Sequence, residues 1–337
     1  MKNLRKHSKN RLAKPIFFLY LDLNFLIKTL LTITKLFILI IDFVIIFHMF
    51  DPKTNKFPYP EDTAQHYLPV NKDNGNVYDE NYPYIDHSFW FNFKRGFIKF
   101  LIIIIMFPLL RIRMGLRIKG KKNLRKYKKL YKNGAVSICN HIHMWDFPCI
   151  MRALMPRRPN IIVWDRNCSG ENAFFVRMIG GIPIPTQSLR GTAKMTRETL
   201  NFVEKGGWLH VCAETAMWEY YAPIRPFKEG ASYFAYKADK PLVPMAFSYR
   251  ECGWIRKKIF HQVAKITLNI GEPLFANKDL PKVEAMRDLT TRAHEAVCAL
   301  AGWKKGENIY PPIYDEKSSK RIDYYTKEYG AGYKGSW

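Results

Sequence analysis

The stretch SICNHIHMWDFP, residues 137–148, places four polar side chains directly after a short apolar run. They are Asn140, His141, His143 and Asp146, and they stand at the start of a predicted helix. In open α/β sheets, ligands bind at such positions, where a strand ends beside a helix N-terminus. The stretch therefore predicts a functional site at the carboxyl end of a strand.

Short apolar runs of strand length recur downstream of residue 133, and helical stretches lie between several of them. Residues 192–207 end in paired glycines, a helix-stop signal, and residues 283–303 repeat apolar side chains on one helical face. This alternation is typical of an α/β domain with a mainly parallel sheet flanked by helices. The expected strands are residues 135–139, 160–164, 180–185, 208–214, 241–249 and 265–271.

Two apolar segments precede this domain and predict an N-terminal membrane-associated helical motif. Residues 16–50 are apolar, and their densest part, residues 30–50, reaches the ~20 residues needed to cross a hydrocarbon core. Residues 97–110 contain a proline and are short for a span, which suits a re-entrant or interfacial helix. The alternative is that both segments are core helices of a soluble protein. Three charged side chains of the first segment recur every seven residues and form one polar stripe that should avoid lipid: Lys28, Lys35 and Asp42.

The formal net charge of +25 is distributed unevenly. Residues 1–14 carry six Lys or Arg and residues 111–132 carry eleven, without an acid in either segment, whereas residues 51–88 carry seven acids against three Lys. Basic flanks belong on the cytoplasmic side of a membrane, so we expect a cell-membrane protein with a cytoplasmic catalytic domain. Two topologies remain open: two spans with the acidic segment outside, or a half-embedded helical pair with everything inside. Three basic side chains on the outer flank weigh against two spans: Lys94, Arg95 and Lys99.

The basic segment 111–132 also predicts a patch that binds anionic membrane lipids. No nucleic-acid motif accompanies it, so nucleic acid is not an expected partner. The predicted organisation is a membrane-associated region (1–110) with an acidic connecting segment (51–92), a catalytic α/β domain (111–303) and a Tyr/Lys-rich tail (304–337). The six cysteines are scattered without a CxxC pair, which favours reduced thiols in a reducing compartment.

Three interpretations of the polar stretch compete. His141, His143 and Asp146 could ligate a metal, with His210 as a further ligand, but no other cluster completes a plausible ligand set. They could form a polar turn in which Asn140 or Asp146 caps the helix. In the third interpretation, His141 precedes the helix and Asp146, on its first turn, reaches back to hold one imidazole nitrogen, which leaves the other nitrogen as a base.

Asn140-His141-x4-Asp146 resembles the NHx4D motif of the glycerolipid acyltransferase family, and the resemblance extends over roughly residues 110–275. FFVRMIGGIPIPTQSLR, residues 174–190, is similar to the family's second block. HVCAETAMWEYYAPIRPFKEGASYFAYKADKPLVPMAF, residues 210–247, is similar to the third and fourth, and Glu214 matches the glutamate of the third. Family members typically carry a helical membrane motif ahead of these blocks, as expected here.

The chain departs from the family pattern where phosphate-binding arginines are usual. The second block has PIPTQ around Thr186 in place of a strand ending in arginine, and the third reads AETAMW in place of PEGTR, without its glycine and arginine. This indicates a subfamily. Arg166 stands where the family often has a basic residue between the first two blocks. Four further candidates for the phosphate contacts are Arg190, Lys194, Arg225 and Lys228.

The resemblance implies direct transfer of a fatty acyl group from a thioester, either acyl-CoA or acyl carrier protein, to a lysophospholipid hydroxyl. The expected acceptor is 1-acylglycerol-3-phosphate, and the expected product is phosphatidic acid. His141 would be the general base and Asp146 would orient it. Asn140 and Glu214 would bind substrate, and backbone amides at the helix start would stabilise the oxyanion. No metal and no cofactor are expected, and His143 is expected to be structural. The alternatives are a lipid-binding protein without activity and a metal-dependent hydrolase that uses His141 and His143.

Overall fold

The computed structural model describes residues 76–169, 173–218, 220–258, 262, 264–304, 314–315 and 320–321. Contacts divide the chain into two units, Met1–Asp51 and Pro52–Trp337, and all described residues belong to the second. The predicted membrane helix within residues 16–50 therefore lies outside the described residues. So do most of the acidic segment and nearly all of the tail, of which only the paired strands β8 (Tyr314–Asp315) and β9 (Lys320–Arg321) are described.

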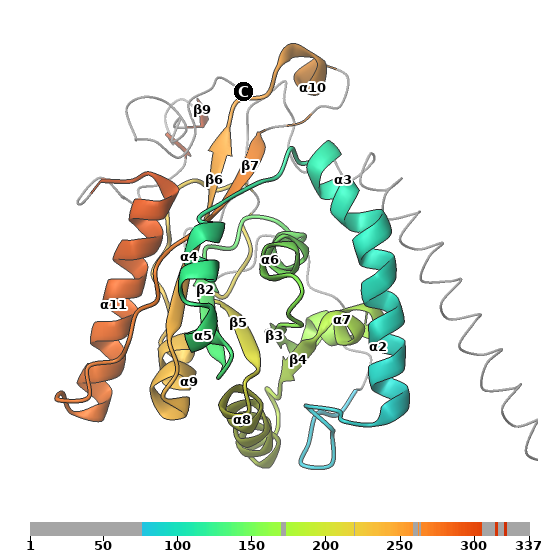
Figure 1. The fold of residues 1–337 in the computed structure, drawn as a ribbon, viewed down its shortest axis with the longest axis vertical. Coiled ribbons are helices and arrows are strands. Elements are labelled where there is room, and N and C mark those ends of the chain that lie inside the picture. The colour runs from blue at the N-terminus through green and yellow to red at the C-terminus, as the bar shows by residue number, and fades with distance from the viewer. Residues whose placement is uncertain are drawn as a thin grey trace, which may run out of the picture. The chain divides into compact units, whose positions relative to one another are not determined.

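A seven-stranded sheet forms the centre of the described unit, in the order β1-β7-β6-β2-β5-β3-β4 (Figure 1). The five strands from β6 to β4 run parallel, and β7 is antiparallel to β6. The predicted α/β fold with a mainly parallel sheet is confirmed, and each predicted strand matches an observed one to within two residues at either end. Of the strands in this sheet, only β1, inside the basic segment, was not predicted. The strands are β1 Arg117–Lys119, β2 Ala135–Cys139, β3 Asn160–Trp164, β4 Gly181–Ile184, β5 Trp208–Cys212, β6 Leu242–Arg250 and β7 Lys265–Ile270.

Helices cover both faces of this sheet. Right-handed crossovers from β2 through β3 to β4 place α6 (Asp146–Leu154) and α7 (Ala173–Ile179) on one face. The connections from β4 to β5 and from β5 to β6 run back across the sheet and place α8 (Leu189–Glu204) and α9 (Gly230–Ala238) on the other face. On that face α11 (Lys282–Ala301) packs against α9. The shorter elements are α4 Lys121–Lys126, α5 Lys128–Tyr131, the 3₁₀ turn η3 Asp165–Cys168 and α10 Trp254–Lys258.

A long helix precedes the sheet and packs on α6 and α7. It consists of α2 (Phe89–Leu101), a π-helical segment η2 (Ile102–Met106) and α3 (Phe107–Ile112). The predicted helix 97–110 thus begins eight residues earlier, because the Ser88 side chain caps it by accepting a hydrogen bond from the Phe91 amide. No helix among the described residues is both long and apolar enough to cross a membrane.

Two basic side chains of this helix form hydrogen bonds to the segment that precedes β3. Lys99 donates to the carbonyl of Pro156 at 2.8 Å, and Arg95 donates to the Pro159 carbonyl at 3.1 Å and to the Asn160 side chain. These contacts fix the helix to the loop that leads into β3.

Candidate active site

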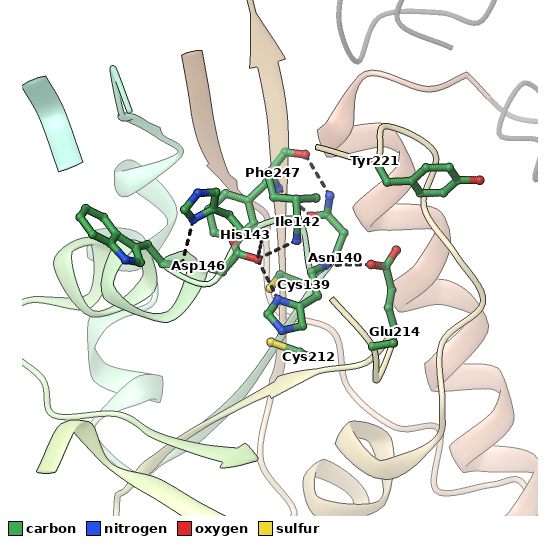
Figure 2. A network of polar contacts seen from close by, with 12 residues as sticks. Cys139, Asn140, Ile142, His143, Asp146, Cys212, Glu214, Tyr221 and Phe247 are labelled. Carbon is green, nitrogen blue, oxygen red and sulfur yellow. Dashed lines mark hydrogen bonds and ion pairs between the residues drawn. The ribbon is translucent and has the colours of Figure 1, made fainter. Parts of the chain in front are cut away.

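Residues 140–145, called the His141 turn below, connect the central strand β2 to helix α6 at the carboxyl end of β2. Figure 2 labels Asn140, Ile142 and His143 of this turn. The two neighbouring strands, β5 and β6, run parallel to β2, so the segments that follow β5 begin beside the turn. The Nδ1 atom of His141 lies 2.9 Å from Asp146 Oδ2. This is the geometry that the sequence predicted, with the histidine before the helix and the aspartate on its first turn.

Asp146 organises the turn through one oxygen. Besides the His141 ring, Oδ2 accepts hydrogen bonds from the amides of Ile142 at 2.7 Å and His143 at 3.0 Å. The carboxyl group is buried, and burial, opposed by the hydrogen bond from His141, raises its pKa to about 6. A carboxylate acceptor at Nδ1 fixes the proton of a neutral ring on that atom and leaves Nε2 as the basic nitrogen.

The His141 side chain remains 22% exposed, whereas that of Asp146 is 1% exposed. Burial disfavours a charged imidazole, but the negative charge of the neighbouring Cys212 thiolate and the hydrogen bond to Asp146 outweigh burial and raise the pKa of His141 to about 10. The site therefore stabilises the protonated ring. This is the form that a general base reaches when it accepts a proton.

The backbone of the turn is held by groups from far along the chain. The His141 amide donates to Glu214 Oε2 at 2.8 Å, and the carbonyls of His141 and Ile142 accept hydrogen bonds from the amides of Trp218 and Tyr220. The amides of Ile142 and His143 are committed to Asp146. The prediction that amides at this helix start stabilise an oxyanion is therefore wrong for these two, because each already has an acceptor.

Asn140 holds the turn against β6. Its side-chain amide donates to the Phe247 carbonyl at 3.1 Å, and its side-chain oxygen accepts from the Phe247 amide at 2.8 Å. Asn140 is buried, and these two hydrogen bonds join the end of β2 to β6, while its predicted contact with substrate stays a prediction. Figure 2 shows Asn140 pointing to Phe247, on the side of the turn away from Cys212.

Glu214 and Arg225 form a buried ion pair beside the turn. Arg225 Nη2 lies 2.9 Å from Glu214 Oε2, and the Arg225 amide donates to Oε1 at 2.7 Å. The guanidinium also binds the Ala216 carbonyl and lies 4.5 Å from the centre of the Trp218 ring. Both side chains are buried, and the predicted roles, acceptor hydroxyl binding for Glu214 and phosphate binding for Arg225, stay predictions.

The other four predicted phosphate ligands are distributed over three segments of the chain. Arg166 follows β3 in η3 and is half-buried. Arg190 and Lys194, at the start of α8, face Glu80 at 3.5 Å and Glu198 at 3.6 Å respectively. Lys228 is exposed ahead of α9. The phosphate contacts of all four residues stay predictions.

His143 does not join His141 as a metal ligand. It is buried, and its Nδ1 atom accepts a hydrogen bond from the Trp145 amide at 3.1 Å. Burial, aided by the positive charges of Arg113 and His141, lowers the pKa of His143 to about 3. Within the described part of the chain a different trio of metal-ligand side chains gathers, on β2 and β5: Cys139, His210 and Cys212.

Sequence reasoning missed this trio and the Glu214–Arg225 pair. Ser137 and Cys139 are two residues apart in one strand, and so are His210 and Cys212 in another. Residues two apart point to the same face of a strand, so the sequence could place each pair on one face. Their proximity depends on the parallel register, which pairs Ser137 with His210 and Cys139 with Cys212.

Comparison with known proteins relates residues 115–248 to the family described as Acyltransferase. The crystal structure of the 1-acyl-sn-glycerophosphate (LPA) acyltransferase PlsC from Thermotoga maritima is similar to this chain with a TM-score of 0.40 and 15% sequence identity. The match covers 63% of this chain and 84% of that chain. No curated protein sequence matches the chain.

Proposed function

We propose that this protein transfers a fatty acyl group from a thioester to a hydroxyl of a lysophospholipid, because residues 115–248 match the family described as Acyltransferase. The proposed acceptor is 1-acylglycerol-3-phosphate, which would give phosphatidic acid. The observation that carries the mechanism is the hydrogen bond between His141 and Asp146. Asn140, His143 and Asp146 are buried, and the His141 amide is bonded to Glu214. The His141 ring, by contrast, is partly exposed to solvent, so it is the polar side chain of this segment that a substrate could reach.

The reaction needs a base for the attacking hydroxyl. Nε2 of the neutral His141 ring would take the hydroxyl proton as the acceptor oxygen attacks the thioester carbonyl carbon. The tetrahedral intermediate then collapses, the C–S bond breaks, and the leaving sulfur takes the proton from the ring. Asp146 would stabilise the imidazolium between these two steps through its hydrogen bond to Nδ1. Because a protonated ring cannot accept the hydroxyl proton, transfer should accelerate as the pH rises toward the raised pKa of His141.

The outer face of the long N-terminal helix supports membrane binding. Large apolar side chains recur along it at helical spacing and are exposed: Phe89, Phe93, Phe97, Phe100 and Ile104. A groove of about 360 Å³ at its C-terminal end is lined by Phe107, Ile112, Arg111 and Arg152, so apolar and cationic groups lie together there. This combination suits an amphipathic helix lying in a layer of anionic lipid. We infer that the catalytic domain lies on the cytoplasmic face of the cell membrane, where lysophospholipid and a soluble acyl-CoA or acyl carrier protein meet.

The test is acyl transfer by the full-length protein in vesicles that contain phosphatidylglycerol. A labelled long-chain acyl-CoA or acyl carrier protein would be offered with lysophosphatidic acid, glycerol-3-phosphate or other lysophospholipids, and the labelled products would be separated. The proposal expects label in phosphatidic acid. Label in free fatty acid alone would indicate a hydrolase. Saturable lipid binding with no labelled product for any acceptor would indicate a lipid-binding protein without activity.

A further inference from the structure

Cys139, His210 and Cys212 bring three metal-ligand atoms together beneath the His141 turn. The Nε2 atom of His210 lies 3.3 Å from Cys139 Sγ and 3.9 Å from Cys212 Sγ, and all three ligand atoms lie within 4.8 Å of one another. Cys139 and His210 are buried, and Cys212 is half-buried. Both cysteines are the last residues of their strands and are paired directly in the parallel register.

The orientation of the His210 ring is fixed by its surroundings. Its Nδ1 atom lies 2.8 Å from Ser137 Oγ, and the ring of Phe147, from α6, stacks on it with a centroid distance of 6.0 Å. The Ser137 hydroxyl also accepts from Trp208 Nε1 at 2.8 Å and lies 3.4 Å from the Leu209 carbonyl.

These contacts suit one tautomer of His210. If Ser137 donates its proton to the Leu209 carbonyl, its oxygen accepts from both Trp208 and His210 Nδ1, and every polar atom of the group is satisfied. His210 then carries its proton on Nδ1 and directs the lone pair of Nε2 at the two sulfur atoms. Metal-bound histidines typically donate their second ring N–H to a protein acceptor in this way.

The spacing fits a tetrahedral ion. With Zn–S bonds of ~2.3 Å and Zn–N bonds of ~2.0–2.1 Å, tetrahedral angles place nitrogen and sulfur ligands about 3.6 Å apart. The observed nitrogen–sulfur distances of 3.3 and 3.9 Å lie on either side of this value. Two thiolates and an imidazole favour Zn²⁺ over Mg²⁺ or Ca²⁺, which prefer oxygen ligands.

We propose that Cys139, His210 and Cys212 bind a zinc ion between β2 and β5, with a fourth coordination position open to water. The ion would join the carboxyl ends of the two strands directly before the segments that carry His141 and Glu214. The site differs from the predicted ligand set, which grouped His141 with His143. It does not depend on acyl transfer being the activity of the protein.

Cobalt(II) is the probe, because thiolate-bound Co²⁺ absorbs in the near ultraviolet and tetrahedral Co²⁺ gives strong visible bands. The reduced, metal-free full-length protein would be titrated with Co²⁺ under anaerobic conditions and then with Zn²⁺. We expect both sets of bands to saturate at one ion per chain and to disappear when Zn²⁺ is added.

Three cysteine variants define the ligand set. Cys139→Ser and Cys212→Ser should each abolish the thiolate band or weaken it at least tenfold. Cys298→Ser is the matched control, since Cys298 is also buried and its sulfur lies 3.7 Å from a histidine nitrogen, that of His294, within one helix. That variant should retain the bands.

A milder variant covers the case in which the serine proteins fail to fold. Ser137→Ala removes the acceptor for His210 Nδ1 and leaves all three ligands in place, so the affinity for Co²⁺ should fall by about 10–100-fold. Wild-type protein without a thiolate band would overturn the proposal. So would bands of unchanged intensity in Cys139→Ser and Cys212→Ser, or unchanged affinity in Ser137→Ala.

Discussion

The carboxylate of Glu214 and the guanidinium of Arg225 lie 2.9 Å apart in a buried pair that also holds the His141 amide. Removing one partner leaves an uncompensated buried charge, which typically costs about 3–5 kcal/mol. Arg225→Met should therefore lower the free energy of unfolding by that amount. Adding Glu214→Gln to it should recover part of the loss, because the remaining side chains are neutral.

Urea denaturation of the two single variants and the double variant measures this coupling as a double-mutant cycle. Glu272→Gln is the control, since Glu272 and Lys126 form an ion pair of similar length, 2.8 Å, on the exposed surface. It should leave the stability unchanged within error. Additive effects of the two buried substitutions would show that the pair contributes no interaction energy.

Thr215, next to Glu214, adopts a left-handed backbone conformation with φ of 66°. The third block of the resembled family has glycine at this position, and a side chain there costs about 1–2 kcal/mol of backbone strain. Glycine also loses more entropy on folding, so Thr215→Gly should raise the free energy of unfolding by about 0.5–1 kcal/mol. Thr196→Gly, inside α8, should lower it in the same thermal or urea experiment. Loss of stability in Thr215→Gly would contradict the strain argument.

His143 makes the stability depend on pH. Burial and the nearby charges of Arg113 and His141 lower its folded-state pKa to about 3, whereas a histidine in an unfolded chain has a pKa of ~6.5. Between these values the unfolded chain binds a proton that the folded protein excludes. The contribution of His143 to stability is therefore lost as the pH falls from about 6.5 toward 3, by up to about 1.4 kcal/mol per pH unit.

His143→Asn keeps an acceptor for the Trp145 amide and removes the titrating ring. Between pH 7 and pH 4.5 the variant should lose about 2 kcal/mol less stability than the wild type. The raised pKa of Asp146 contributes stability with the opposite pH dependence. Both proteins contain Asp146, so its contribution cancels when they are compared at the same pH. Equal losses in the two proteins would mean that His143 is protonated in the folded state.

The exposed face of the long helix should enter the lipid layer. A fluorophore attached at Phe100→Cys is expected to shift to shorter wavelength on vesicles that contain phosphatidylglycerol, and spin-labelled lipids should quench it, because Phe100 is exposed among other apolar side chains. Lys237→Cys, exposed on α9, is the control and should show neither effect. The fluorophore reports the environment of position 100 alone, so the result does not depend on whether residues 16–50 also contact the membrane. Unquenched fluorescence at position 100 would exclude the helix from the membrane.

Local patterns predicted the parts of the structure that depend on neighbouring residues. The strand 135–139, the helix after it and the contact of His141 with Asp146 are formed within one short segment, so their spacing carried the information. The start of the long helix was missed because residues 89–96 mix aromatic and basic side chains, although Ser88 is a recognisable cap.

The partners of the site residues could not be predicted from local sequence patterns, because they lie far away along the chain. Asn140 binds Phe247, 107 residues away, and Cys139 meets Cys212 only through the register of two strands. The pairing of Arg225 with Glu214 is equally hidden, because an exposed arginine and one paired inside the protein have the same local sequence. These contacts depend on tertiary packing, which one sequence does not reveal.

The most direct test of the proposed function compares the rate of acyl transfer, as kcat/KM, between wild-type protein and His141→Ala. His143→Asn serves as a control in the same turn, and circular dichroism confirms that all three proteins are folded. Loss of the general base should reduce the rate by about a hundredfold or more in His141→Ala, while His143→Asn stays within a few-fold of the wild type. A folded His141→Ala protein that transfers acyl groups at a rate near that of the wild type would contradict the account.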